Sequence, residues 1–395
     1  MKRYAGVILI VLIALNLRPA VVAVGPLLRQ IQDDLGLSGV AAGALTTLPV
    51  LFFGSFGLVA PLFRRAPRGE FMLVISMSLL VVALVSRLIP TQVALFGGAL
   101  LAGIAISVGN IAVPSIIKRD HPRSITTVTA VYTVAITVGA AVSSSVVVPM
   151  EHAMDSGWRL PLVLLAVPAA VAAIAWLPRL RGAAASMPPP EGGSPRVWRS
   201  PLAWQVTGFM GLQSLLAYVT SGWLPTICQD RGLSEAAGGY ALGLTSLLQA
   251  VGAFLVPVIE RRLRDQRPLV AIVGLLCVIG YAGLVWAPVG TVWLWIVVLG
   301  LGQGVGFATA LSFIGLRASD AHVTAQLSGM AQGLGYVIAA LGPLVVGAVH
   351  DATHSWNAPT VLVLVISVAM LAPGFGAGRT RTIGEARLPE RAAAT

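Results

Sequence analysis

A single arginine, Arg18, stands in the middle of the first long apolar stretch of the chain, which runs from Ile8 to Val24. A guanidinium keeps its proton at physiological pH, and a charged side chain at the centre of a bilayer costs at least about 2.5–3.5 kcal/mol. We therefore expect Arg18 either to have a partner or to face a watery cavity. This residue type at this depth predicts a site that binds an anion.

Two structural explanations compete with ligand binding at Arg18. Its side chain is too far from either end of the apolar stretch to reach the membrane surface, which excludes snorkelling. Pro19 lacks a backbone N–H and leaves a carbonyl of the preceding turn without its donor. A hydrogen bond from Arg18 to such a carbonyl therefore remains an alternative to ligand contact.

Uncharged polar residues occur at similar depth in other apolar stretches. Gln332 and Tyr336 are four residues apart and share one helix face, whereas Gln213 and Tyr218 are five apart and share only a broad one. For each, a hydrogen bond between helices is the alternative, at about 0.6 kcal/mol on average. The candidate binding residues are Arg18, Asn16, Gln213, Tyr218, Gln332 and Tyr336, with Asn110, Tyr132, Gln249 and Gln303 as a second group.

Carboxylates are missing from the middle of every apolar stretch. All 15 Asp and Glu residues fall in predicted loops, span ends or tails, and so do the five histidines. A carrier that moves protons on an intramembrane carboxylate needs one at that depth. Arg18 instead predicts a positive centre, which suits an anionic solute or one that ionises at a ring nitrogen. Cotransport of the anion with a proton is a further alternative, and it needs no carboxylate.

The composition predicts that these residues belong to an integral membrane protein. Of the 395 residues, 56% are hydrophobic and only 10% are charged, whereas soluble domains have about 25% charged residues. Apolar stretches of about 20 residues are long enough to cross a bilayer core. The sequence contains twelve, at 5–28, 40–62, 71–89, 92–116, 125–148, 158–177, 202–226, 238–259, 268–287, 291–315, 323–348 and 357–376.

Basic residues mark one side of this predicted bundle. Most of the 26 Lys and Arg residues lie in every second connection, while the opposite connections hold only Arg29, Arg87, Arg159 and Arg231. The positive-inside rule then predicts cytoplasmic termini, in a bacterial-type inner membrane. The net charge of +11 is explained by topology and contact with membrane lipid rather than by a nucleic-acid partner.

The chain divides into two similar halves. A Pro- and Gly-rich cytoplasmic linker, predicted at 179–200, separates six-helix bundles at 1–178 and 201–377, and a cytoplasmic tail follows at 378–395. An offset of 196 residues aligns Asp34 and Gly36 with Asp230 and Gly232, which indicates duplication. Parallel repeats with a substrate site between them are typical of the major facilitator fold. The predicted fold class is therefore all-α, a twelve-span major facilitator fold made of two parallel six-helix bundles.

Catalysis is not expected. No predicted loop holds a nucleophile–base pair or a set of metal ligands, and Cys228 and Cys277 have neither metal nor redox spacing. We therefore expect no enzymatic activity, no cofactor and no bound metal, and we expect a monomer. A membrane sensor that uses the same fold without net flux is the alternative of another class.

Short motifs in the same order along nearly the whole chain resemble the cyanate permease / 2-nitroimidazole exporter family of the major facilitator superfamily. They include Leu15-Asn16-Leu17-Arg18-Pro19, Val113-Pro114-Ser115, Gly211-Leu212-Gln213-Ser214, Ser328-Gly329-Met330-Ala331-Gln332 and His350-Asp351. The resemblance implies transport of a small anionic, cyanate-like solute, with export of a planar nitrogen heterocycle such as a 2-nitroimidazole as the alternative.

The resemblance also implies a gate on each side of the membrane. The superfamily usually has an Asp in the loop after the second span, where this chain has Pro61. The gating residues proposed for the cytoplasmic side, Arg64, Arg65 and Arg68, lack that partner, and Glu70 is the available substitute. His350 and Asp351 are the candidates for the opposite gate.

Overall fold

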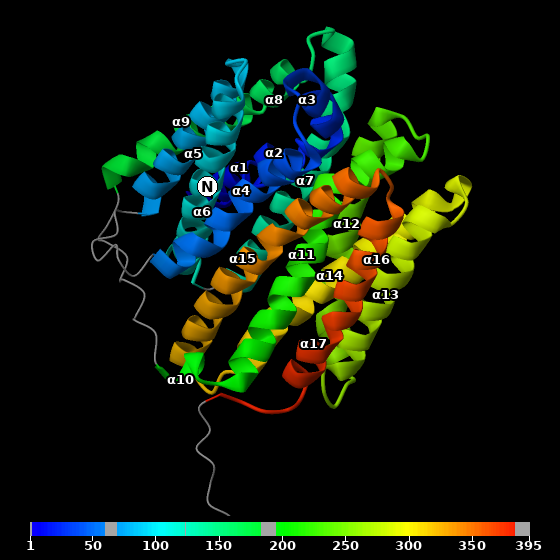
Figure 1. Ribbon diagram of the computed structural model, residues 1–395. Helices are drawn as coiled ribbons and strands as arrows, with labels where there is room; N and C mark the ends of the chain where they lie inside the picture. Colours follow the sequence, from blue (N-terminus) through cyan, green and yellow to red (C-terminus); the bar gives the residue numbers. More distant parts are fainter. Residues whose placement is uncertain (1, 60–68, 123, 183–194, 384–395) are drawn as a thin grey trace, which may run out of the picture.

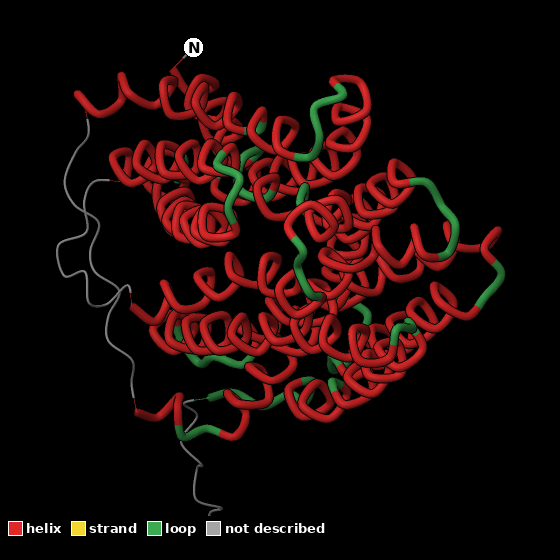
Figure 2. Tube along the Cα trace, turned by 45° about the horizontal axis from the view of Figure 1, so that its top comes forward, coloured by secondary structure: helices red, strands yellow, loops and turns green. Residues whose placement is uncertain are grey.

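Helices make up nearly all of the computed structural model, which describes residues 2–59, 69–122, 124–182 and 195–383. Short loops join them, as Figure 2 shows. Among these described residues the only extended pairing is an isolated bridge between Ala318 and Ile383. The prediction of an all-α fold is confirmed.

The N-terminal half begins with a span built from four short pieces and continues with longer helices (Figure 1). Its elements are α1 (Lys2–Ala14), α2 (Pro19–Val22), η1 (Gly25–Leu27), α3 (Leu28–Leu35), α4 (Gly39–Val59), α5 (Gly69–Val85), η3 (Ser86–Leu88), α6 (Gln92–Asp120), α7 (Ile125–Met154), α8 (Arg159–Leu164), α9 (Ala166–Trp176) and η4 (Leu177–Gly182).

The C-terminal half has fewer breaks. Its elements are α10 (Pro195–Trp198), α11 (Pro201–Asp230), α12 (Glu235–Glu260), α13 (Arg267–Trp286), η5 (Val289–Thr291), α14 (Val292–Leu316), α15 (Ala321–Thr353), α16 (Asn357–Ala369) and α17 (Leu371–Ala377). Polar N-caps fix where several long helices begin: the side chains of Ser200, Ser234 and Asp320 each accept a hydrogen bond from the backbone N–H three residues further on.

These helices supply the twelve predicted spans. Ten described segments are long and apolar enough to cross a membrane, and α4 adds a shorter apolar stretch, Gly39–Phe52. The twelfth span is α11, a helix of 30 residues. Some helices outrun the predicted spans, as α7 does by continuing to Met154, because hydropathy marks the membrane core and not the end of the hydrogen-bonded helix. Residues 183–194 of the predicted linker lie outside the described part, so the domain boundaries stay predictions.

The first span is not the continuous helix that its apolar run predicts. Helix α1 ends at Ala14, four residues form a turn, and Pro19 opens the short helix α2 with Arg18 as its N-cap. Pro19 has no N–H, so it cannot donate to the carbonyl of Leu15 one turn earlier. Within the turn, the N–H of Leu17 bonds the carbonyl of Ala14, three residues back, at 3.2 Å. The break therefore places Arg18 where the helix is interrupted.

Helix α7 packs directly against this break. A Cβ added at Gly139 would lie 2.4 Å from the carbonyl oxygen of Leu15, which is closer than any side-chain carbon can approach. A glycine at this position thus lets the backbone of α7 touch the interrupted turn. The close approach holds the first span against the fifth.

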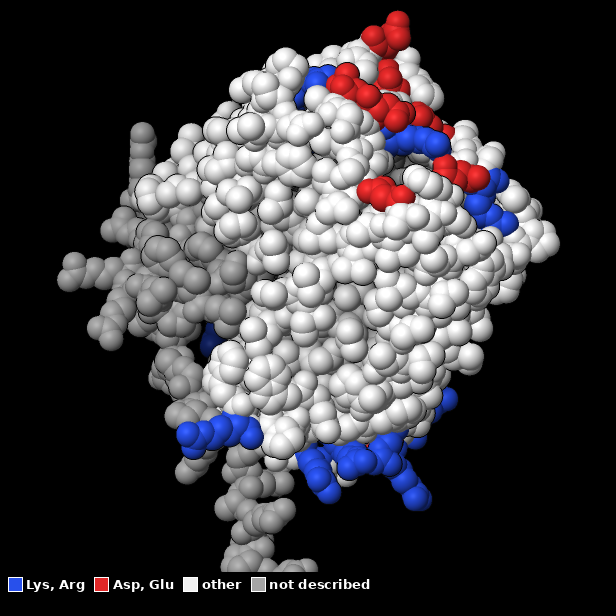
Figure 3. All heavy atoms as spheres, viewed as in Figure 1, with Lys and Arg blue, Asp and Glu red and all other residues white. Residues whose placement is uncertain are grey.

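Charge is distributed unevenly between the two ends of the bundle. In Figure 3 Asp and Glu gather at the upper right, with a few Lys and Arg among them, while the bottom edge shows Lys and Arg without such an acidic group. We call the first the acidic end; its acidic residues are Asp33, Asp34, Glu151, Asp155, Asp230, Glu235 and Asp351. We call the opposite one the basic end. In Figure 1 the basic ends of the N-terminal helices lie at the left and those of the C-terminal helices at the bottom, so the two halves diverge in that direction.

The halves meet closely near the acidic end. Helix α4 packs along α15 and α7 along α12, and η1 contacts α11. Glycines permit these contacts: an added Cβ would lie 2.5 Å from the carbonyl of Pro343 at Gly43 and 2.5 Å from that of Ser144 at Gly239. Such spacing allows backbone-to-backbone packing without a bulky side chain in between.

The aligned positions of the two halves have the same local geometry. Gly36 and Gly232 both have positive φ, at 62° and 90°. Asp34 accepts a hydrogen bond from the indole of Trp158 at 3.1 Å, and Asp230 accepts one from the indole of Trp356 at 2.8 Å. In each half this bond ties the end of the first span of that half to the start of its sixth.

We predict that Gly139→Ala lowers the midpoint of thermal unfolding in detergent, because the new methyl group overpacks the break by about 1–3 kcal/mol. The matched control is Gly97→Ala in α6, where an added Cβ meets nothing within 4 Å and alanine favours the helix. Its midpoint should be equal to or above that of the parent. Equal midpoints for the two variants would contradict the close contact at Leu15.

Candidate functional site

Arg18 lies at the centre of a cluster of tyrosines. Its guanidinium donates a hydrogen bond to the hydroxyl of Tyr218, and Tyr336 and Tyr132 lie within electrostatic range of it. Arg18 and Tyr132 belong to the N-terminal half, Tyr218 and Tyr336 to the C-terminal half. We call these four residues the Arg–Tyr cluster. The structure thus brings together three of the main candidate binding residues, Arg18, Tyr218 and Tyr336, with Tyr132 of the second group.

The rings of the cluster are held by further contacts. The rings of Tyr218 and Tyr336 meet edge to face, with centroids 6.3 Å apart. The hydroxyl of Tyr132 donates to the side-chain oxygen of Asn110 at 3.1 Å, which adds a second-rank residue of α6 to the site. Aromatic pairs of this geometry contribute about 0.5–1.5 kcal/mol beyond the area they bury.

The cluster faces the space between the two halves. Arg18 and Tyr336 are partly exposed, although both lie at mid-depth. Because the tyrosines around Arg18 come from both halves, its exposed part points between the halves and not toward lipid. Asn110 and Lys118 are exposed on the same face of α6, which continues from the cluster toward the basic end. Among the described residues no carboxylate forms an ion pair with Arg18.

Gln332 and Asn16 lie near the cluster in sequence but have partners of their own. The amide of Gln332 donates to the hydroxyl of Ser328 at 2.7 Å, one turn earlier on α15. Asn16 is buried, and its amide donates to the carbonyls of Leu12 at 2.7 Å and Pro168 at 3.3 Å. The bond to Pro168 joins the first span to the sixth. This is the hydrogen bond between helices that was the alternative to ligand contact.

Gln303 and Gln249 belong to a separate polar network inside the C-terminal half. The amide of Gln303 donates to the hydroxyl of Thr220 at 2.6 Å and to that of Tyr281 at 3.2 Å, while its oxygen accepts from Gln249 at 2.8 Å. Tyr281 also donates to the carbonyl of Leu216 at 2.6 Å. This buried network joins α11, α12, α13 and α14. Sequence reasoning missed Thr220 and Tyr281, because a lone hydroxyl in an apolar stretch gives no signal of its partner.

Gln213 is buried in the same half, with 3% of its surface exposed. Its amide donates to the hydroxyl of Ser214 at 2.7 Å and to the carbonyl of Met210 at 3.2 Å. Its oxygen is buried without a hydrogen-bond partner and faces the glycine position 306 of α14. Gln213 is therefore oriented toward a helix of its own half.

The acidic end joins the two halves by polar contacts. Asp351 on α15 accepts a hydrogen bond from the N–H of Val40, at the start of α4, at 3.3 Å. Arg29 forms an ion pair with Asp230 at 2.7 Å. The ring of His350 packs on Trp356 with centroids 4.3 Å apart. Of the two residues predicted for this gate, Asp351 thus contacts the other half, whereas His350 packs on a tryptophan of its own half.

The basic end is described only in part. Arg64, Arg65 and Arg68, the predicted gating arginines, lie outside the described residues. Glu70 is buried and forms an ion pair with Arg119 at the end of α6. Asp120 in turn contacts Arg179 at 3.3 Å. Glu70, the substitute for the loop aspartate, therefore has an arginine partner within its own half.

Comparisons with known proteins agree with this architecture. Residues 7–343 match the model of the Major Facilitator Superfamily. The chain is 39% identical to the 2-nitroimidazole transporter of Escherichia coli (strain K12) over 95% of both chains. It is 31% identical to the cyanate transport protein CynX of the same organism, over 88% of this chain and 91% of that protein. An uncharacterized transporter of Bacillus subtilis (strain 168), YycB, is 37% identical over 95% of this chain and 93% of its own.

Solved structures show the same fold at low identity. A bacterial homolog of the human lysosomal transporter Spinster, in an inward-facing and unoccupied conformation, superimposes with a TM-score of 0.74 over 96% of this chain and 97% of that one, at 13% identity. The twelve spans, the two parallel halves and the sequence matches lead to one conclusion. The chain belongs to the major facilitator superfamily, in the family of the 2-nitroimidazole and cyanate transporters.

Proposed function

We propose that this chain is a secondary transporter that carries a small anionic or weakly acidic solute, with Arg18 as the charge that holds it. The main support is the environment of Arg18: at mid-depth its guanidinium is surrounded by tyrosines, with no carboxylate ion pair among the described residues. A buried cation of this kind is costly until it is paired. An anion that enters between the halves supplies the missing negative charge.

The binding chemistry follows from the groups in the Arg–Tyr cluster. A guanidinium has five N–H donors in a planar fork, and one of them bonds the neutral hydroxyl of Tyr218. An anion is a stronger acceptor than a hydroxyl, so it displaces Tyr218 from the guanidinium. The hydroxyl of Tyr218 then donates a hydrogen bond to the solute. Gln332, four residues before Tyr336 on α15, supplies a further amide on that face.

Alternating access fits the position of the cluster. Its tyrosines come from both halves, so a bound solute contacts both, as a carrier site between two repeats requires. The halves are joined at the acidic end and diverge toward the basic end (Figure 1). The positive-inside rule assigns the basic end to the cytoplasm, which makes this the inward-facing state of an inner-membrane protein with cytoplasmic termini.

Asp351, His350 and the Arg29–Asp230 pair then form the outer gate. Arg29 and Asp230 are 50% and 26% exposed, and exposed pairs contribute only about 0–1 kcal/mol each. Weak contacts suit a gate that opens in every cycle. Opening it exposes Arg18 to the other side of the membrane.

Two substrate classes compete for this site. Relatives of this chain are named for cyanate and for 2-nitroimidazole. A small linear anion needs mainly the guanidinium. A planar nitrogen heterocycle also needs an aromatic wall, and the edge-to-face pair Tyr218 and Tyr336 favours this second candidate. Cotransport of the anion together with a proton requires no carboxylate in the membrane.

Counterflow in proteoliposomes tests the proposal. Vesicles that contain the purified chain are loaded with unlabelled cyanate or 2-nitroimidazole and diluted into the labelled compound. Transient accumulation of label identifies a carrier and selects the substrate class. A membrane sensor would bind the solute, which thermal shift detects, and would show no counterflow.

We predict that Arg18→Gln and Arg18→Lys each lower kcat/KM for the transported solute. A hydrogen bond to a charged group contributes about 1.5–3 kcal/mol, which corresponds to roughly 10- to 100-fold. Lysine retains the charge but lacks the planar fork, so the loss should persist. Arg262→Gln is the control, since Arg262 is exposed at the basic end. Unchanged transport in both Arg18 variants would refute the role of Arg18.

We also predict that Tyr336→Phe raises KM about 3- to 10-fold with little change in kcat, because it removes one hydroxyl beside the guanidinium and keeps the ring. Tyr336→Leu removes the ring too, and it should impair transport of 2-nitroimidazole more than transport of cyanate. Tyr240→Phe is the control, because Tyr240 is exposed. Equal effects of Leu on both solutes would exclude an aromatic wall.

A further inference from the structure

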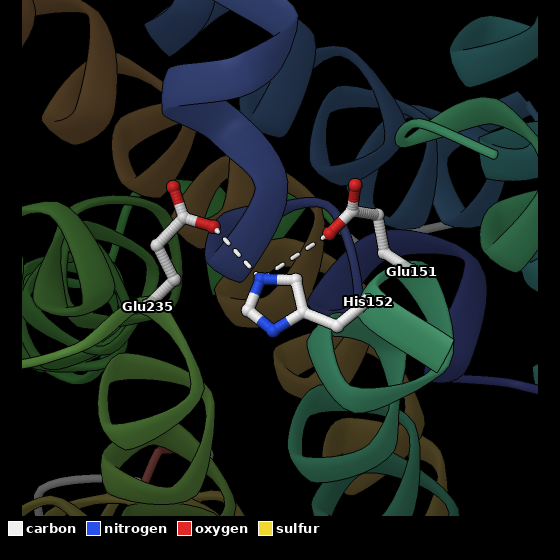
Figure 4. A group of neighbouring side chains, drawn as sticks. All are labelled: Glu151, His152 and Glu235. Atoms are coloured by element: carbon white, nitrogen blue, oxygen red, sulfur yellow. Dashed lines mark ion pairs between the residues drawn. The ribbon is translucent and has the colours of Figure 1, made fainter. Parts of the chain in front are cut away.

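Three potential metal ligands from different halves converge at the acidic end. Glu151 and His152 lie in the last turn of α7, and Glu235 is the first residue of α12. Figure 4 shows the imidazole of His152 between the two carboxylates, with both pointing toward it. Because 83 residues separate His152 from Glu235, only the packing of α7 against α12 brings them together.

The distances between the ligand atoms suit a small coordination sphere. Nε2 of His152 lies 3.4 Å from Oε2 of Glu151 and 3.8 Å from Oε2 of Glu235, and all three ligand atoms lie within 4.8 Å of one another. In a tetrahedral zinc site, bonds of about 2.0–2.1 Å place two ligands about 3.3–3.4 Å apart. Small side-chain rotations are therefore enough to complete the site.

The carboxylates in this cluster lack a permanent counter-charge. Among the described residues neither Glu151 nor Glu235 forms an ion pair with a lysine or arginine. The Glu151 side chain is only 15% exposed, and its Oε2 is buried without a hydrogen-bond partner. Glu235 is oriented by Gln30, whose amide donates to its Oε2 at 2.8 Å. An outer-shell amide of this kind is a usual support for a ligating carboxylate.

The ligand types favour a transition metal. Imidazole suits zinc, copper and nickel, whereas magnesium and calcium are bound by oxygen ligands alone. His152 is 60% exposed, so an ion and its remaining water ligands can reach the site from solution. Three protein ligands leave at least one position for water.

We propose that Glu151, His152 and Glu235 form a binding site for a divalent transition-metal ion of the zinc type, and that the bound ion holds the acidic ends of the two halves together. The ion bridges α7 and α12, so it binds well only while those ends are close. An occupied site therefore stabilises the state in which the halves meet at the acidic end, and it slows any step that separates them.

Calorimetric titration of the purified, untagged protein with ZnCl₂ tests the site without any transport assay. One equivalent should bind at micromolar concentration and raise the midpoint of thermal unfolding, while MgCl₂ should do neither. His152→Asn and Glu235→Gln should each weaken zinc binding at least tenfold. The control is His354→Asn, at the end of α15, because asparagine tolerates the positive φ of 48° found there.

Loss of zinc binding in His354→Asn to the same degree as in His152→Asn, or no binding by the parent protein, would overturn the site. In that case the three side chains contact one another and hold no ion. A second measurement tests the link between the halves: zinc added to the acidic-end side of proteoliposomes should inhibit transport by the parent and not by Glu235→Gln. Binding without such inhibition would overturn the link and leave the proposed transport function untouched.

Discussion

An arginine that cannot lose its charge, placed at the middle of a membrane span, is the constraint on which the rest of the structure depends. In the described part of the chain, hydroxyl groups and not carboxylates contact the guanidinium: Tyr218 accepts a hydrogen bond, and Tyr132 and Tyr336 lie within electrostatic range. Because these groups come from both halves, the two halves must stay close at mid-depth. The interrupted first helix places this cation, and the glycine of α7 packs against the break.

The buried polar groups have different roles in the two halves. In the C-terminal half, Gln303, Tyr281 and Thr220 bond to one another and join three helices, α11, α13 and α14. Those amides and hydroxyls form hydrogen bonds to other groups of the protein. The N-terminal half contributes the charge, on a helix that is broken and therefore able to present a side chain away from a regular helical face.

Much of this architecture could be predicted from sequence, for reasons that differ from residue to residue. Arg18 was recognisable because a charge contrasts with its apolar neighbours, and the repeat was visible because Asp34 and Asp230 keep one offset. The break at Pro19 was harder to predict. A continuous apolar run indicates that a segment lies in the membrane, but it does not show where the backbone hydrogen bonds are interrupted. The partners of Gln303, and the approach of Glu235 to His152, depend on which helices become neighbours, and this is set by packing over the whole chain.

Asp34 and Asp230 are aligned by the repeat, yet they form ion pairs with different halves. Asp34 pairs with Arg159 of its own half at 2.8 Å, whereas Asp230 pairs with Arg29 of the other half. One copy thus strengthens a domain, and its duplicate fastens two domains together. The position of the arginine partner decides whether the ion pair lies within one half or between the two. Under the proposed alternating access, a change at the exposed Arg29 would therefore alter the contact between the halves without touching the buried parts of either half.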